Sequence, residues 1–196
     1  WCNPCYLIVM PIAINGSGSI TGISAGGLPD GCVTADDLAS GVGGKILQVV
    51  QTVKTDTASE SVASGNLTST IYLPTNITPS SASNKILITV SICLQDYAQV
   101  YIALQRDGSS ICVGDAEGNR QRVTSGTYMF DSVSLATVNA QFLDSPSTTS
   151  QVTYGVKLAS RDNQASTIYV NRTEANNDYS YAFRGASTLI LQEVAA

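Results

Sequence analysis

The clearest alternation of apolar and polar residues lies between residues 85 and 95. Every second residue from 86 to 94 is a large aliphatic one, and most of the residues between them are small or polar. A period of two places one set of side chains on each face of a strand. The pattern resumes over residues 100–105 and ends at an Asp-Gly pair, which favours a tight turn. The sequence therefore predicts a central pair of strands with one buried face.

Similar short runs recur between turn signals in the rest of the chain. They cover residues 46–53, 67–73, 86–94, 100–105, 111–113, 128–138, 152–158, 167–172 and 188–194. The run at 128–138 changes phase midway, which indicates a bulge or a bend. About nine antiparallel strands and no convincing amphipathic helix predict an all-β domain over residues 45–196, either a β-sandwich or a jelly roll.

A glycine-rich segment of low aromatic content precedes these strands, over residues 10–44. Alone, it cannot bury enough apolar surface to offset the entropy lost on ordering. One short helical signal occurs at residues 34–39, with Thr34 as the N-cap. We expect an extended N-terminal arm that is ordered by its neighbours and contains one short helix. Its apolar contact residues would be Ile12, Ile14, Ile20, Ile23, Leu28 and Leu38.

Residues 1–9 differ in character from the segment that follows them. They contain an apolar run, which at four residues is far shorter than the ~20 needed to span a bilayer. We interpret Met10 as the natural start and residues 1–9 as an upstream remnant. The Trp-Cys-Asn-Pro-Cys motif at residues 1–5 resembles a redox dithiol, but no strand–helix–strand pattern follows it, so a working redox site is the less favoured reading.

Charge and composition narrow the range of functions. A net charge of −5 disfavours broad affinity for nucleic acid, because such binding depends on lysine and arginine displacing counterions. The chain has no histidine and so lacks the commonest general base and metal ligand. Most acidic residues occupy turn positions, and no pattern brings two of them together as a catalytic pair. We predict a non-enzymatic protein without a cofactor.

One polar stretch has the residue types of a calcium loop. Asp115, Glu117 and Asn119 place oxygen atoms at alternating positions around a glycine. A calcium site needs six to eight ligands, which this stretch alone does not supply. A solvated turn is therefore the favoured interpretation, and we predict no metal site.

The strongest recognition candidate is a polar and aromatic stretch near the C-terminus. Tyrosine offers a flat apolar face with a hydrogen-bonding tip, and asparagine and aspartate can bind hydroxyl groups, so the mixture suits a sugar. In the alternative interpretation, the stretch leads into a strand and its aromatic side chains pack on the core. The candidate contact residues are Asn176, Asn177, Asp178, Tyr179, Tyr181 and Arg184.

Several blocks of sequence occur in a characteristic order from Met10 onward. They are MPIAINGSGSITG (10–22), GLPDG (27–31), LASG (38–41), GKILQVVQ (44–51), ITPSSASNKIL (77–87), FLDSP (142–146), IYVNR (168–172) and STLILQEVAA (187–196). Together they resemble a family of small bacteriophage structural proteins, common among marine and cyanobacterial phages, that are tail-fibre-like or virion-associated.

The resemblance implies a component of the virion surface with an N-terminal attachment arm and a β-rich distal domain. It transfers no catalytic residue. By analogy with phage fibres, we expect a homotrimer that also contacts another virion protein through its arm, with a host-surface glycan as a further candidate partner and no contact with nucleic acid or membrane. Three alternatives stay open: a capsid decoration protein of the same fold, a secreted carbohydrate-binding module, and a polysaccharide hydrolase.

Overall fold

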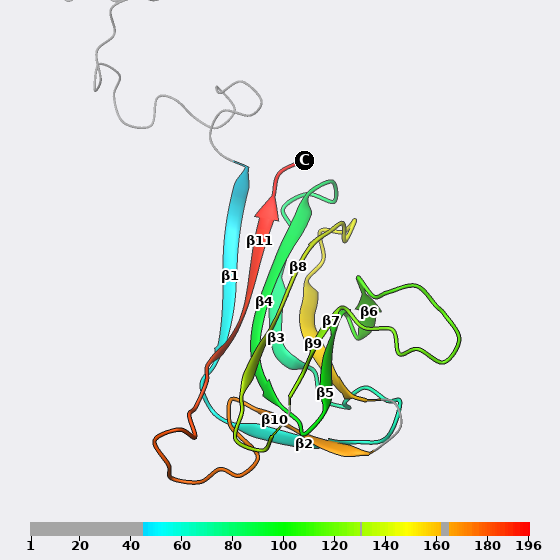
Figure 1. The fold of residues 1–196 in the computed structure, drawn as a ribbon. Coiled ribbons are helices and arrows are strands. Elements are labelled where there is room, and N and C mark those ends of the chain that lie inside the picture. The colour runs from blue at the N-terminus through cyan, green and yellow to red at the C-terminus, as the bar shows by residue number, and fades with distance from the viewer. Residues whose placement is uncertain (1–44, 130, 162–164) are drawn as a thin grey trace, which may run out of the picture. The chain divides into compact units, whose positions relative to one another are not determined.

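The computed structural model describes residues 45–129, 131–161 and 165–196, which contain eleven strands in two antiparallel sheets (Figure 1). None of these residues is helical. Accordingly, this part of the chain has no helix that could cross a membrane. The prediction of an all-β fold is confirmed. In chain order the strands are β1 Ile46–Lys54, β2 Ala58–Val62, β3 Tyr72–Ile77, β4 Lys85–Gln95, β5 Gln99–Arg106, β6 Ser109–Ile111, β7 Ser125–Tyr128, β8 Ala136–Asp144, β9 Val152–Ser160, β10 Ser166–Val170 and β11 Ser187–Val194.

Strand β4 lies at the centre of the first sheet, here called sheet A. β8 pairs with one edge of β4 over residues 86–94. β11 and β10 share the other edge, where β11 pairs with residues 85–91 and β10 with Leu94 and Gln95. β1 then pairs with β11, and β2 pairs with β10. Sheet A is therefore four strands wide although six strands build it (Figure 1).

The second sheet, sheet B, follows the same principle. β9 lies between β3 and β5. β7 and β6 share the far edge of β5, where β7 pairs with residues 99–102 and β6 with residues 104–106. In each sheet, two strands placed end to end thus cover one edge of a longer strand: β11 and β10 along β4, and β7 and β6 along β5.

The hydrophobic core takes side chains from both sheets. The aliphatic set of β4, which includes Ile88, Val90 and Ile92, is at most 1% exposed, as its alternation predicts. Sheet B contributes Ile102 of β5 and Val156 of β9, which are equally buried. The two sheets form a sandwich-like arrangement, with the core between them.

The opposite side of sheet A, here called the outer face, consists of the alternate residues of its four long strands. These side chains are half-buried or exposed, whereas their sequence neighbours point into the core. The outer face comprises Leu47, Val49, Gln51 and Val53 of β1, Thr188, Ile190, Gln192 and Val194 of β11, Lys85, Leu87, Thr89, Ser91 and Cys93 of β4, and Thr137, Asn139, Gln141 and Leu143 of β8.

The predicted strand list is wrong in four places. The strand expected at 111–113 lies earlier, at Ser109–Ile111, as β6. Strand β2, with the sequence Ala-Ser-Glu-Ser-Val, was missed because its small polar residues lack a strand pattern. The strand expected at 67–73 begins only at Tyr72 as β3. The run at 128–138 is not one bent strand: β7 ends at Tyr128 in sheet B and β8 begins at Ala136 in sheet A. Its change of phase marks the passage of the chain from one sheet to the other.

Several expectations lie outside the described residues. They are the remnant at 1–9, the arm at 10–44 with its helix at 34–39, and the arm contacts Ile12, Ile14, Ile20, Ile23, Leu28 and Leu38. They stay predictions.

Candidate recognition loop

Residue Asn171 fixes the base of the loop that joins β10 to β11. Its side chain is fully buried, and its Nδ2 donates to the carbonyl oxygens of Lys54 at 2.8 Å and Asp56 at 3.0 Å. Its Oδ1 accepts a hydrogen bond from the Ser187 hydroxyl at the far end of the loop. Asn171 also has a φ of 58°, a left-handed conformation that asparagine tolerates better than most residues. The loop therefore starts and ends on one buried amide.

The outer part of the loop presents a pair of aromatic rings. Tyr179 and Tyr181 stack with their centroids 5.1 Å apart and their planes 25° apart. A tight turn brings them together, because the Ala182 amide donates to the Tyr179 carbonyl at 2.9 Å. The two tyrosines are 53% and 60% exposed, and Phe183 beside them is 53% exposed. The aromatic residues of this loop thus face solvent and do not pack on the core.

The predicted polar contacts lie on the same loop. Arg184 Nη2 donates to Asn176 Oδ1 at 2.8 Å, which links the two sides of the aromatic turn. Asn177 and Asp178 are exposed in the segment between Asn176 and the first tyrosine. The structure therefore brings together two pairs, Tyr179 with Tyr181 and Asn176 with Arg184.

A saccharide is the ligand class that matches this arrangement. Stacked aromatic rings give a rigid apolar surface on which the C–H face of a sugar ring can lie, and nearby amide and guanidinium groups can bind its hydroxyls. No protein-family model and no curated protein sequence matches this chain.

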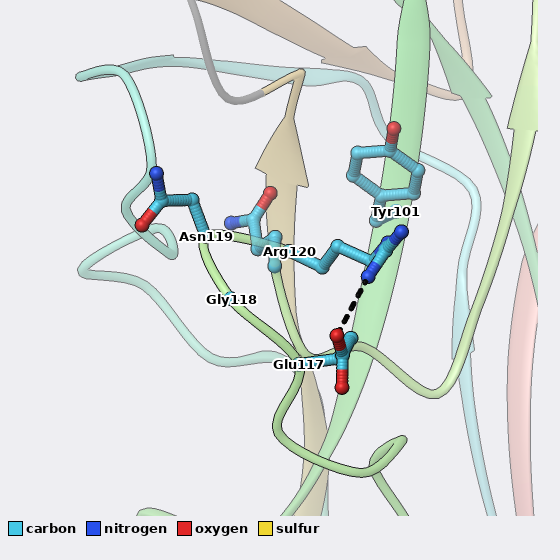
Figure 2. Close-up of a pocket in the computed structure, with 6 residues that line it drawn as sticks. Tyr101, Glu117, Gly118, Asn119 and Arg120 are labelled. Carbon is cyan, nitrogen blue, oxygen red and sulfur yellow. Dashed lines mark ion pairs between the residues drawn. The ribbon is translucent and has the colours of Figure 1, made fainter.

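A second arrangement, which sequence reasoning missed, lies between strand β5 and the loop that follows β6. Tyr101 and residues 117–121 line a hollow of about 640 Å³ (Figure 2). Arg120 extends across it toward Tyr101, and its Nη1 lies 3.6 Å from Oε1 of Glu117 (Figure 2). Both amide atoms of Gln121 are buried and have no hydrogen-bond partner among the described residues. The hollow thus combines an aromatic wall with an unsatisfied amide.

A close packing contact holds the ring of Tyr101 in this wall. Tyr101 pairs with Gly126 of β7 across the sheet. A Cβ atom at Gly126 would lie only 2.4 Å from Cδ1 of Tyr101, so the ring occupies the space that a side chain would take. This relationship depends on strand register, which the sequence alone did not give.

The candidate calcium ligands Asp115, Glu117 and Asn119 are all exposed on the same loop. Glu117 faces Arg120, and that charge opposes cation binding. Across the described residues, no three His, Cys, Asp or Glu side chains are grouped as metal ligands. The interpretation of this stretch as a polar turn stays the favoured one.

A second hollow, of about 590 Å³, lies along β1, β2 and the start of β3. It contains ionisable groups with shifted pKa values that stabilise the fold. Burial opposes the charge of Glu60, but hydrogen bonds from Thr70 and Ser69 outweigh burial and lower the pKa of its carboxyl. Burial and the neighbouring Glu60 raise the pKa of Tyr72 to about 12. Because Tyr72 donates to Glu60 at 3.3 Å, the pair ties β3 to β2. These pKa shifts have a structural cause and do not indicate a catalytic site.

Proposed function

We propose that this chain is a non-enzymatic structural protein of a bacteriophage particle that attaches to host-surface glycan through the loop at residues 171–187. The stacked and exposed pair Tyr179–Tyr181 is the observation that carries the glycan part of the proposal. The ordered sequence blocks that resemble tail-fibre-like and virion-associated proteins support the particle part. Both parts suit a protein whose role is recognition.

Hydrogen bonds hold the loop in place, which favours a role of the loop in ligand recognition. A ligand surface binds more tightly when it is ordered before binding, because less conformational entropy is lost in the complex. Asn171 and Ser187 close the base of the loop, and Arg184 with Asn176 closes its outer part. The segment that carries the tyrosine pair is therefore held by hydrogen bonds on both of its sides.

In the proposed architecture, the β-domain is a jelly roll that projects from the particle. The arm at residues 10–44 attaches the β-domain to another virion protein. Three copies would form a homotrimer. Several copies on one particle raise the overall avidity for a glycan surface even when each site is weak.

Glycan binding by the full chain tests the proposal. We expect array screening to find a surface polysaccharide or oligosaccharide, and Tyr179→Ala or Tyr181→Ala to weaken its binding about tenfold, which corresponds to about 1.4 kcal/mol of lost stacking. Tyr97→Ala is the matched control, because Tyr97 is 65% exposed in the turn between β4 and β5. Equal binding by the three variants and the parent would refute the role of the loop.

Location on the particle separates attachment from capsid decoration. An attachment component should co-purify with tails or fibres and lose host adsorption when Tyr179 is replaced. A decoration protein should co-purify with empty heads, and the same replacement should leave adsorption unchanged. A secreted carbohydrate-binding module would instead bind glycan as a monomer with no particle attached.

A further inference from the structure

The hollow between β5 and the loop at residues 112–124 has the size and the support of a ligand site. Its volume of about 640 Å³ lies within the range of about 300–1,000 Å³ that is usual for small-molecule sites. Backbone hydrogen bonds fix the base of the loop. The Gly114 amide donates to the Val123 carbonyl at 3.3 Å, which closes the loop on itself. The Thr124 amide donates to the Ile102 carbonyl at 2.8 Å, which ties the loop to β5.

Gln121 brings to this hollow a hydrogen-bonding pair that the described part of the chain leaves unused. Its Oε1 accepts and its Nε2 donates, yet both atoms are buried and neither has a partner among the described residues. Nearly all buried polar atoms in folded proteins have a partner, so an unpaired amide that lines a ligand-sized hollow indicates which groups belong there. A ligand for this site must present a donor and an acceptor side by side.

Arg120 extends across the hollow toward Tyr101 and is only weakly held (Figure 2). Its guanidinium lies 3.6 Å from the Glu117 carboxylate, and the two side chains are 76% and 75% exposed. Ion pairs between such exposed groups contribute little to stability, so a ligand can displace the Arg120 side chain at little cost. Among the residues that line the hollow, Arg120 and Glu117 are the charged ones, and their charges cancel. The site therefore suits a ligand without net charge.

Adjacent hydroxyl groups of a sugar ring match the amide of Gln121. One hydroxyl can donate to Oε1 while its neighbour accepts from Nε2. The apolar face of the same sugar can lie on the ring of Tyr101, which its close contact with Gly126 holds in position. A peptide suits the site less well, because the N–H and C=O groups of a trans peptide bond point in opposite directions. A nucleobase edge has a suitable pair of groups, but a chain of net charge −5 has little attraction for the phosphates of a nucleic acid.

We propose that this hollow binds a neutral saccharide through two adjacent hydroxyl groups. Its residues belong to β5 and to the loop at residues 112–124, and none of them lies in the loop at residues 171–187. The proposal therefore holds or fails separately from glycan binding by the tyrosine pair. Together the two loops would give each chain two glycan contacts, which raises the avidity for a polysaccharide surface.

Nuclear magnetic resonance of the isotope-labelled full chain tests the proposal, because the side-chain NH2 group of Gln121 gives its own signals. The probes are the methyl glycosides of glucose, galactose, mannose and N-acetylglucosamine, each added up to about 20 mM, since a site with few contacts supports a Kd of about 1 mM. We expect at least one of them to shift the signals of the Gln121 NH2 group and the Tyr101 amide in a saturable way.

Substitutions then assign the binding to the hollow. Gln121→Leu removes the hydrogen-bonding pair and Tyr101→Ala removes the ring, and each should raise the Kd about tenfold. Gln141→Leu is the matched control, because it makes the same change at an exposed glutamine of β8 and should leave the Kd unchanged. The spectrum of each variant shows whether it is folded, and the titration of the parent depends on no variant.

Three further probes separate this site from its alternatives. Glucuronate adds a charge, cyclohexylmethanol has an apolar ring and a single hydroxyl, and a methylated adenine has a base edge without a sugar. Tighter binding of any of these than of the neutral glycosides, or no shift at Gln121 with any glycoside, would overturn the proposal. Shifts confined to residues 171–187 would overturn it too, while leaving glycan binding by that loop intact. Shifts confined to the hollow would support it and count against the tyrosine pair.

Discussion

Tyr154 of β9 donates a hydrogen bond of 2.6 Å to Asp144 Oδ2 of β8, and this contact joins the two sheets. Arg106 of β5 completes the group, because its Nη1 lies 3.0 Å and 2.9 Å from the two carboxylate oxygens. Asp144 and Tyr154 are both buried. Burial raises the pKa of Tyr154, and its hydrogen bond to Asp144 raises it further. A buried carboxylate therefore serves as a bridge between sheet B and sheet A.

Removal of this bridge should destabilise the domain. Tyr154→Phe loses one hydrogen bond to a charged group and should lower the free energy of unfolding by about 2 kcal/mol. Asp144→Ala also strands the Arg106 charge and should cost at least about 3 kcal/mol, a figure at the low end for buried pairs because Arg106 is one-third exposed. Urea denaturation with an unchanged m-value measures both. Tyr97→Phe is the control, and a Tyr154→Phe variant as stable as this control would contradict the role of the bridge.

The sequence predicted the strands that have one buried and one solvent-facing side. It did not predict which strands pair with one another. Strand β4 alternates cleanly because one side meets the core and the other forms the outer face. Its pairing with β11 joins residues about 100 positions apart, and no local pattern encodes such a contact. The missed strand β2 is held by pairing with β10, so tertiary context outweighed its weak propensity.

The recognition loop could be predicted only in its outer part. Tyr179 and Tyr181 stand out because exposed aromatics beside asparagine are a compositional signal. The buried anchor Asn171 gave no such signal, since an asparagine before a polar stretch looks like any turn residue. The hollow beside Tyr101 depends on the register of Gly126, which only the folded sheets supply.

Stability in acid should depend on Glu193. This buried residue of β11 accepts hydrogen bonds from Asn84 at 2.6 Å, from Gln48 at 2.6 Å and from both the amide and the hydroxyl of Ser80 at 2.7 Å. Burial opposes its charge, but these donors prevail and lower its pKa to about 2 from a usual value of 4.5. Because the folded-state pKa lies below the unfolded one, the stabilisation is complete above about pH 4.5 and is lost as pH falls toward 2. The loss should reach about 3 kcal/mol.

A neutral variant isolates this contribution. Glu193→Gln should be less stable than the parent at pH 7. The NH2 group of the new side chain would face the NH2 group of Gln48 or Asn84, so that two hydrogen-bond donors meet without an acceptor. Its free energy of unfolding should then fall less steeply between pH 5 and pH 2.5. Parallel pH profiles for variant and parent would show that other carboxylates cause the acid sensitivity.

Asn171 should stabilise the loop through both its backbone conformation and its side-chain hydrogen bonds, and two substitutions can separate these contributions. Asn171→Gly keeps the left-handed φ but loses the buried amide, and should cost about 2 kcal/mol for the unpaired carbonyls and hydroxyl. Asn171→Ala should cost about 1 kcal/mol more, because alanine is strained at a φ of 58°. Thermal melting gives the order, and limited proteolysis should show faster cleavage within residues 172–186. Equal stability of the two variants would remove the backbone part of this explanation.

The contact between Gly126 and Tyr101 gives a prediction that a double-mutant cycle can test. Gly126→Ala should cost about 1–3 kcal/mol, because its Cβ would lie 2.4 Å from the tyrosine ring and 2.9 Å from the carbonyl oxygen of Val100. Gly114→Ala is the matched control, since a Cβ there meets nothing within 4 Å, and it should leave stability nearly unchanged. In a Tyr101→Ala background the ring clash is gone, so Gly126→Ala should cost less and only the clash with the carbonyl should persist. Additive effects of the two substitutions would mean that the ring does not rest on Gly126.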